Sequence, residues 1–268
     1  MRHRDAHLNL VESSRRLFGL DPGAEVEAGE RWMFGAGTPT HPLISNAAFR
    51  IDDALDPGEL LERARAFFGT RGRGFALWAR AGVPEDEDLI AAAEAAGLRA
   101  VHSMPAMVFD RRVEAKPLPA DAELRRVASV ADADAYWQVA AEAYKSNGFP
   151  PEIFGHYTDH EGLYREGIAA FLVRLDGEPA SIAMTIVTHG VAGIYWVGSR
   201  ERARGRGFGW TTTAAAIDAG FEMGADMTSL QASPMGEPIY RRMGFQTIFD
   251  YRLFLCGRHN DQPTSSLT

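Results

Sequence analysis

The stretch that decides the fold runs from Gly193 to Met223 and reads GIYWVGSRERARGRGFGWTTTAAAIDAGFEM. Apolar residues at 193–198 predict a strand, and the alanine-rich residues 210–223 predict a helix. The glycine-rich segment Arg204–Gly209 lies between them and opens the helix. A helix N-terminus carries free N–H groups and the positive end of the helix dipole, and glycine lets a phosphate approach the backbone closely. We therefore predict an anion site here, to which Arg204 and Arg206 add charge and forked donors.

Three other kinds of glycine-rich segment fit this stretch less well. A P-loop ends in Gly-Lys-Ser/Thr, and the segment contains no lysine. A dinucleotide-binding fingerprint has the spacing Gly-x-Gly-x-x-Gly, and its third glycine, counted from Gly205, falls on Trp210. A nucleic-acid-binding arginine–glycine segment is disordered and repeated, whereas this one lies between a predicted strand and a predicted helix. The pattern that remains is Arg-x-x-Gly-x-Gly.

Charge and composition restrict the partners. The 268 residues carry a net charge of −8, which argues against nucleic-acid binding and favours a neutral or cationic small partner. No stretch approaches the roughly 20 apolar residues of a membrane helix, so no membrane partner is expected. The charged N-terminus is not followed by the apolar core of a secretory signal. Cys256 is the only cysteine, which excludes an internal disulfide and fits the reducing cytoplasm.

From residue 120 onward, strands and helices follow a definite order. Strands are predicted at 123–127, 168–175, 181–187, 194–197, 227–232 and 245–255, and helices at 130–146, from 150, at 210–223 and at 237–243. Asp176-Gly177, between the second and third strands, is a strong hairpin signal. The sequence therefore predicts an α+β fold with a mixed α/β sheet, in the order β-α-α-β-β-β-α-β-α-β.

The first half partly repeats this order. Helices at 57–69 and 86–96 alternate with strands at 75–80 and 99–109, and Ala96-Gly97-Leu98-Arg99 corresponds to Met243-Gly244-Phe245-Gln246. This suggests two related halves, although any α+β chain can produce such an echo by chance. Because the pattern breaks at 113–122, we expect a degenerate domain at 1–115, a second domain at 120–257 and a flexible tail at 258–268.

A second motif supports the first: Tyr240-Arg241-Arg242-Met243-Gly244-Phe245 falls on the penultimate predicted element. Together with the element order, the two motifs resemble the GNAT superfamily of acyl-CoA-dependent N-acyltransferases over residues 120–257, with the first half as a degenerate GNAT-like copy. The resemblance implies acetyl-CoA (coenzyme A) as cosubstrate, with its pyrophosphate on the glycine-rich loop and its pantetheine arm along the preceding strand. The cofactor-binding residues that it implies are Val197, Gly198, Ser199, Arg204, Gly205, Arg206, Gly207, Phe208, Gly209 and Ser233.

The resemblance also implies roles in catalysis. The N–H of Val197 would face the acyl oxygen, and Gly198 either allows a bulge that splays the strand from residues 227–232 or is an ordinary turn glycine. Tyr240 would be the general acid that protonates the departing thiolate, since a phenol keeps its proton at neutral pH; alternatively, it only packs the short helix onto the core. Several relatives carry a glutamate base on the strand before the loop, and this chain has none there. Other candidates for the base are Glu142, His156, Asp159, His160 and His189, and a mechanism without a side-chain base stays open.

We expect one coenzyme A site, in the second half, and no metal site. The similar letters Arg71-Gly72-Arg73-Gly74 follow a helix and precede a strand, so no helix N-terminus faces them. At the start of the helix at 57–69, a group of carboxylates would repel a pyrophosphate; these are Asp52, Asp53, Asp56 and Glu59. Their more ordinary role is to interact favourably with the helix dipole. The acceptor should contact the helices at 130–146 and 150–165, whose aromatic residues supply either a binding surface or core packing; these are Tyr144, Phe149, Phe154 and Tyr157.

These observations predict an N-acetyltransferase that moves an acetyl group from acetyl-CoA directly to a primary amine of a small molecule or peptide. A non-catalytic acyl-CoA-binding sensor is the main alternative, and a structural protein that binds no nucleotide is a third. The first half could serve as a lid, a packing partner or a dimer surface, so a homodimer remains open.

Overall fold

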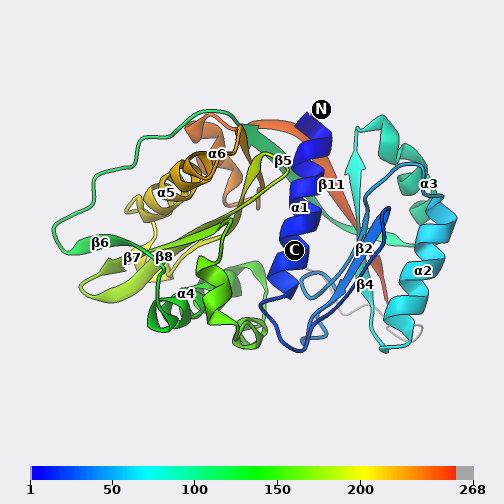
Figure 1. The fold of residues 1–268 in the computed structure, drawn as a ribbon, viewed down its shortest axis with the longest axis horizontal. Coiled ribbons are helices and arrows are strands. Elements are labelled where there is room, and N and C mark those ends of the chain that lie inside the picture. The colour runs from blue at the N-terminus through cyan, green and yellow to red at the C-terminus, as the bar shows by residue number, and fades with distance from the viewer. Residues whose placement is uncertain (1, 258–268) are drawn as a thin grey trace. The chain divides into compact units, whose positions relative to one another are not determined.

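The computed structural model describes residues 2–257, which form two compact units (Figure 1). Unit 1 contains the chain up to Pro22, Val108–Leu230 and Pro238–Gln246. Unit 2 contains Gly23–Met107, Gln231–Glu237 and the chain from Thr247 onward. The units are thus interleaved in the sequence, whereas the predicted domains were consecutive. The tail predicted at 258–268 lies outside the described residues.

Unit 1 is built on a mixed sheet with the strand order β10-β9-β8-β7-β6. The strands are β6 (Ala122–Arg126), β7 (Ile168–Leu175), β8 (Glu178–Thr188), β9 (Val191–Ser199) and β10 (Met227–Gln231). Only β9 and β10 run parallel, and the other neighbours are antiparallel. The β7–β8 hairpin turns at Asp176 and Gly177, whose φ angles of 51° and 79° are those that the Asp-Gly signal predicts. The predicted fold class is confirmed.

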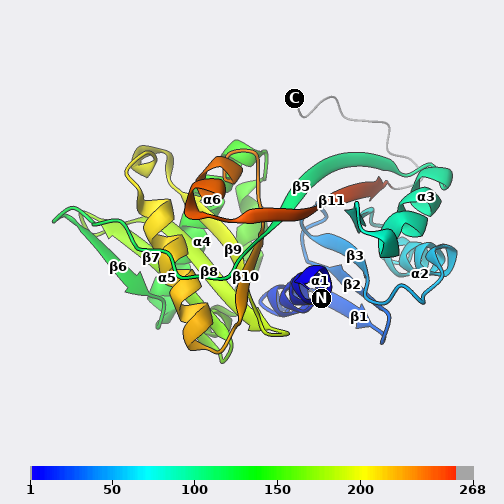
Figure 2. The same ribbon diagram turned by 90° about the horizontal axis from the view of Figure 1, so that it is seen from above.

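Helices cover both faces of this sheet (Figure 1). Helix α5 (Phe208–Glu222) crosses strands β7 to β9 on one face, and α4 (Val130–Ala143) packs on the other (Figure 2). The short helix α6 (Glu237–Met243) precedes β11 (Gln246–Cys256). The α-helix predicted from residue 150 is instead two short 3₁₀ segments, η3 (Pro151–His156) and η4 (His160–Tyr164), which follow η2 (Tyr144–Asn147). The backbone leaves the helical region at Tyr157 and Asp159, whose ψ angles are 75° and 77°, so no continuous i to i+4 ladder forms.

An N-terminal helix, α1 (Arg2–Phe18), belongs to unit 1 and was not predicted. Its buried Asn9 donates to the carbonyl of Val191 at 2.8 Å and to Thr188 Oγ1 at 2.9 Å, and it accepts from the Tyr195 hydroxyl at 2.8 Å. Gly193 makes room for this contact, because a Cβ there would collide with Asn9 Oδ1. The helix is therefore held at the turn between β8 and β9 by hydrogen bonds to residues that lie 179 and 182 positions away in the sequence.

Unit 2 repeats the central part of unit 1 in reduced form. Its strand order is β1-β2-β3-β4-β11-β5, with β1 (Glu25–Ala28), β2 (Trp32–Ala36), β3 (Asn46–Arg50), β4 (Phe75–Ala81) and β5 (Arg99–Phe109). Helix α2 (Pro57–Gly69) joins the parallel strands β3 and β4, as α5 joins β9 and β10. Helix α3 (Glu87–Ala95) follows β4 through the 3₁₀ turn η1 (Pro84–Asp86). A core rich in phenylalanine, including Phe34, Phe68, Phe75 and Phe254, holds the unit together.

No helix among residues 2–257 is long and apolar enough to cross a membrane.

Candidate functional site

The candidate site begins where β9 separates from β10. Their parallel pairing runs from Val191–Met227 to Gly193–Ser229, while β9 continues to Ser199. Opposite β8, two residues of β9, Trp196 and Val197, face a single residue, so the strand bulges there. Trp196 adopts φ 47°, a left-handed conformation that is rare for a large side chain. The splayed strand that was predicted is present, with its bulge just before Gly198.

Gly198 itself is required for close packing. A Cβ at this position would lie 2.8 Å from the Cβ of Ala143 on α4. Ser181 donates from its hydroxyl to the Gly198 carbonyl at 3.1 Å. The glycine therefore lets α4 approach β9 beside the bulge. The sequence analysis considered Gly198 as a residue that allows a bulge or as a turn glycine, and did not consider this packing role.

Two tyrosines of the α4 region hold the carbonyls of the bulge. The hydroxyl of Tyr136 donates to the carbonyl of Trp196, and the hydroxyl of Tyr144 donates to the carbonyl of Val197, each at 3.1 Å. Tyr136 is fully buried. These contacts join residues more than fifty positions apart, so the spacing of residues along the sequence gave no signal for them.

The glycine-rich loop leaves the start of α5 open. Gly205 and Gly207 have φ angles of 75° and 83°, and Gly207 is an N-cap without a side-chain hydrogen bond. The first helical bond runs from the Thr211 N–H to the Gly207 carbonyl. Among residues 2–257, nothing accepts a hydrogen bond from the backbone N–H groups of residues 205 to 210. Free backbone donors at the positive end of a helix are the groups with which proteins bind anions.

The arginine side chains of the loop already have protein partners. The guanidinium of Arg204 donates to Ser146 Oγ at 2.9 Å and to the carbonyl of Ala143 at 3.3 Å, at the end of α4. Arg206 lies 3.8 Å from an Asp121 carboxylate oxygen and over the ring of Phe208. The free donors of the loop are therefore its backbone N–H groups, while Arg204 connects the loop to α4.

Ser199 and Phe208 fix the loop on the sheet. The hydroxyl of Ser199 lies 2.8 Å from that of Ser181. A Cβ on Gly209 would meet Ser199 Oγ at 3.5 Å, an ordinary contact distance. The ring of Phe208 is buried against Val173 and its neighbours. The loop is thus anchored at both ends.

Tyr240, on α6, is placed as a protonated phenol. It is 9% exposed, and burial raises the pKa of its hydroxyl above the ordinary value. No residue among 2–257 hydrogen-bonds to that hydroxyl. Burial is the main cause that raises the pKa of Tyr144, and electrostatic interaction with Tyr240 adds to it. The hydroxyl proton of Tyr144 is already donated to the Val197 carbonyl. Of the two phenols, Tyr240 is therefore the one whose proton is free to be donated.

Ser233 lies in the segment of the chain that belongs to unit 2. Its hydroxyl accepts the N–H of Gly236 at 3.2 Å, within the turn that precedes α6. Its predicted contact with pantetheine stays a prediction.

Most of the candidate bases are occupied. Glu142 pairs with Arg200 at 3.1 Å, Asp159 with Arg165 at 2.8 Å, and His160 with Asp134 at 3.2 Å. His189 lies in the turn before β9, eight residues from Val197 and so more than about 20 Å away along an extended strand. His156, in η3, is half-buried. Three of the five are therefore held in ion pairs, and His189 lies away from the bulge.

Aromatic side chains cluster around Trp196 on the α4 side of the bulge. The Trp196 ring centre lies 5.2 Å from those of Tyr144 and Phe154 and 6.2 Å from that of Tyr157. Phe149 stacks on Tyr144 at 6.0 Å. Phe154 is core, whereas the other members remain partly exposed. The predicted aromatics therefore form one cluster, and the sequence analysis had not included the tryptophan at its centre.

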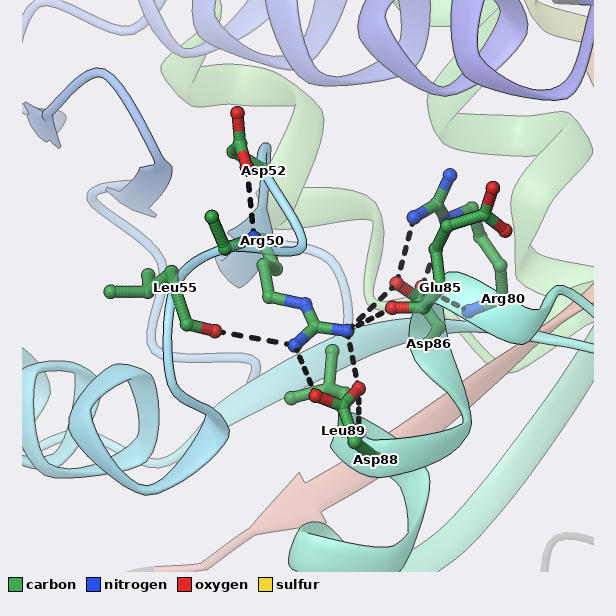
Figure 3. Close-up of polar contacts among 9 residues, drawn as sticks. Arg50, Asp52, Leu55, Arg80, Glu85, Asp86, Asp88 and Leu89 are labelled. Atoms are coloured by element: carbon green, nitrogen blue, oxygen red, sulfur yellow. Dashed lines mark hydrogen bonds and ion pairs between the residues drawn. The ribbon is translucent and has the colours of Figure 1, made fainter.

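The corresponding helix start in unit 2 is closed. Asp56 is the N-cap of α2, and its side chain accepts the N–H of Glu59 at 3.0 Å. At the end of β3, the buried guanidinium of Arg50 donates to the carbonyl of Leu55 at 3.3 Å and to Asp88 at 2.7 Å (Figure 3). It also reaches Asp86, which pairs with Arg80 at 2.7 Å. This helix start carries its own acceptor and a set of paired charges.

Residues 71–74, whose sequence is similar to that of the glycine-rich loop at 204–209, lie between α2 and β4, as predicted. Arg71 pairs with Glu25 at 2.6 Å, and Arg73 donates to the carbonyl of Gly37. Both arginines therefore have structural partners within unit 2.

Comparisons with known proteins agree with this geometry. Residues 110–236 match the family model of the acetyltransferase (GNAT) domain. No curated protein sequence matches the chain significantly.

Solved structures share the fold over almost the whole chain. A GCN5-related N-acetyltransferase from Kribbella flavida has 20% identity and a TM-score of 0.69, covering 96% of both chains. One from Sphaerobacter thermophilus has 16% identity and a TM-score of 0.64, covering 89% of this chain and 84% of its own. A tandem GNAT protein from the clavulanic acid biosynthesis pathway has 12% identity and a TM-score of 0.61, covering 94% and 96%. At these low sequence identities, the comparison shows that the chains share a fold.

Proposed function

Residues 110–236 form a domain of the GNAT acetyltransferase family, and from this premise we propose that the chain is an N-acetyltransferase. It transfers the acetyl group of acetyl-CoA to a primary amine of a small molecule or peptide, within one ternary complex. The single observation that carries the proposal is the open start of α5, with six successive backbone N–H groups, residues 205 to 210, that no described residue occupies. The sole cysteine fits a cytoplasmic setting.

Coenzyme A fits the shape and charge of this loop. Gly205 and Gly207 have no Cβ to obstruct a pyrophosphate, and the helix dipole favours its negative charge. The separated edge of β9 beyond Gly193 offers backbone groups to the amide-containing pantetheine arm. A thioester at the end of that arm would lie beside the bulge at Trp196 and Val197.

The reaction follows from these positions. A neutral amine attacks the thioester carbonyl, and the carbonyl oxygen becomes negative in the tetrahedral intermediate, which backbone N–H groups stabilise. Collapse of the intermediate forms the amide bond and breaks the carbon–sulfur bond, and coenzyme A leaves as a thiolate. Tyr240 is the proposed donor to that sulfur, because its buried phenol stays protonated. The aromatic cluster around Trp196 would contact the acceptor.

The nitrogen also has to lose a proton. Glu142, Asp159 and His160 are paired with other side chains. We therefore propose that the acceptor amine binds in its neutral form and that the one proton its nitrogen must still lose after the attack leaves through water. The same pairing favours the second candidate function, an acyl-CoA-binding sensor that transfers nothing.

An enzyme assay separates the two functions. Purified protein is incubated with acetyl-CoA and a panel of amines and peptide N-termini, and release of the thiol is followed together with acceptor acetylation by mass spectrometry. The proposal expects acceptor-dependent thiol release. Tight binding of acetyl-CoA without turnover on any amine would support the sensor, and the absence of binding would refute both.

A further inference from the structure

The segment of unit 1 that joins β5 to β6 runs across the start of α5. Two side chains in the first turn of that helix hold it there. Trp210 donates from its indole N–H to the carbonyl of Glu114 at 2.9 Å, and Thr211 donates from its hydroxyl to the carbonyl of Lys116 at 3.1 Å. We call residues 114–118 the strap. All of these residues belong to unit 1.

The strap places a lysine side chain at the mouth of the glycine-rich loop. The Cδ of Lys116 lies 3.1 Å from the position that a Cβ on Gly207 would occupy. Its ammonium lies 4.6 Å from the ring centre of Trp210. The methylene chain therefore passes the N-cap of α5, and the ammonium lies over the Trp210 ring in the first turn of that helix.

The ammonium of Lys116 has different partners from those of the guanidinium groups of the loop. Arg204 and Arg206 are engaged by α4 and by Asp121. Lys116 forms no ion pair with any carboxylate among residues 2–257, and its partner is the neutral ring of Trp210. A cation–π contact at an exposed site is weaker than a charge-assisted bond to phosphate, so a phosphate can displace it.

We propose that Lys116 is a phosphate-binding residue of this site, whose ammonium leaves the Trp210 ring to pair with a phosphate oxygen of the bound nucleotide. The inference rests on the proposed function, because the nucleotide is coenzyme A. It assigns to the strap a contribution to affinity in addition to any that Arg204 and Arg206 make with the donors that their protein partners leave free.

Amine labelling tests this directly, because the chain has only two lysines, Lys116 and Lys145. The full chain is treated briefly with the N-hydroxysuccinimide ester of acetic acid, with and without coenzyme A, and modification at each lysine is quantified by mass spectrometry. Coenzyme A should slow modification of Lys116 several-fold relative to that of Lys145. Equal labelling of Lys116 with and without bound coenzyme A would overturn the proposal.

A binding measurement provides the second readout. Lys116→Ala should raise the Kd for coenzyme A by about tenfold, and Lys116→Arg should restore most of the loss. Arg126→Ala on the edge strand β6 removes the same charge as a control and should change the Kd less than twofold. A Kd for Lys116→Ala within twofold of the wild type would refute the inference alone, whereas a wild-type protein that binds no coenzyme A would refute the proposed function as well.

Discussion

Two helices start at equivalent points of the two units and differ in what caps them. Both α5 and α2 connect a pair of parallel strands. The N-cap of α5 is Gly207 in a left-handed conformation without a side-chain bond, whereas that of α2 is Asp56, whose carboxylate takes the N–H of Glu59. The topology alone therefore does not make an anion site. The cap decides whether the positive helix end faces a ligand or an internal carboxylate.

A second difference lies at the strand that leads to each helix. β9 ends in a bulge, and the loop after it is held by Ser199 and Phe208. β3 ends in Arg50, which is buried among Asp86, Asp88 and the carbonyl of Leu55 (Figure 3). Unit 2 thus places a buried cluster of paired charges after the strand that leads to its helix, where unit 1 has the bulge and the glycine-rich loop. Each of the following changes tests that contrast.

The largest effect on stability is expected from Arg50→Met. The change removes a buried cation that donates to Asp86, Asp88 and the carbonyl of Leu55. Among the described residues, Asp88 keeps only the N–H of Leu89 as a donor. The free energy of unfolding should fall by about 3–5 kcal/mol, as measured by urea denaturation at pH 7. Arg252→Met, which breaks an exposed pair with Glu94, is the control and should cost less than about 1 kcal/mol. Equal costs would mean that the network does not stabilise unit 2.

Gly207→Glu should abolish detectable coenzyme A binding, with a loss of at least about a hundredfold in Kd. The new carboxylate would stand at the helix end, on a backbone with φ 83°, against the side chain of Lys116. Gly72→Glu is the matched control, because Gly72 also has a positive φ and lies in the similar letters of unit 2. Isothermal titration of both variants, checked for folding by circular dichroism, decides the matter. If the Gly207→Glu variant bound coenzyme A with wild-type affinity, the glycine-rich loop would not be the binding site.

Tyr240→Phe should lower kcat by about a hundredfold and leave the Kd for coenzyme A unchanged. Burial raises the pKa of this phenol, so it stays protonated through its ordinary value of about 10. The wild-type rate should therefore show no fall from loss of this proton up to about pH 10. Tyr164→Phe is the control. Unchanged turnover in Tyr240→Phe would remove the acid from the mechanism.

The smallest effect is expected from Asp56→Ala, which uncaps α2. Loss of the bond to the Glu59 N–H should lower the free energy of unfolding by about 1 kcal/mol. Asp53→Ala, an exposed neighbour, should change it by less than about 0.5 kcal/mol. If removing this cap alone produced a second coenzyme A site, the charges around Arg50 would have no part in closing unit 2.

Local sequence patterns predicted most of the helices and strands. They could not predict contacts between residues that are far apart in the sequence. The Asp176-Gly177 turn, the helix at 57–69 and the glycine-rich start of α5 each depend on neighbouring residues, so the sequence indicated them correctly. Asn9 joins helix α1 to Val191, 182 positions away, and no local pattern encodes that contact. Charge spacing likewise could not show that Arg204 turns to α4, or that Lys116 reaches Gly207 through the strap.

The same reasoning applies to the site. The motif located the loop and Tyr240, whose surroundings the structure describes. The bulge at Trp196 combines a left-handed residue with two tyrosine hydroxyls from α4. A tryptophan in that conformation contradicts local preference, so only the surrounding packing fixes it.

The most direct test of the contrast between the units is the stoichiometry of coenzyme A binding, measured by isothermal titration calorimetry on the full chain. An open α5 and a closed α2 predict one site per chain, which Gly207→Glu eliminates. Two sites per chain, or a single site that survives Gly207→Glu in a folded protein, would contradict the account.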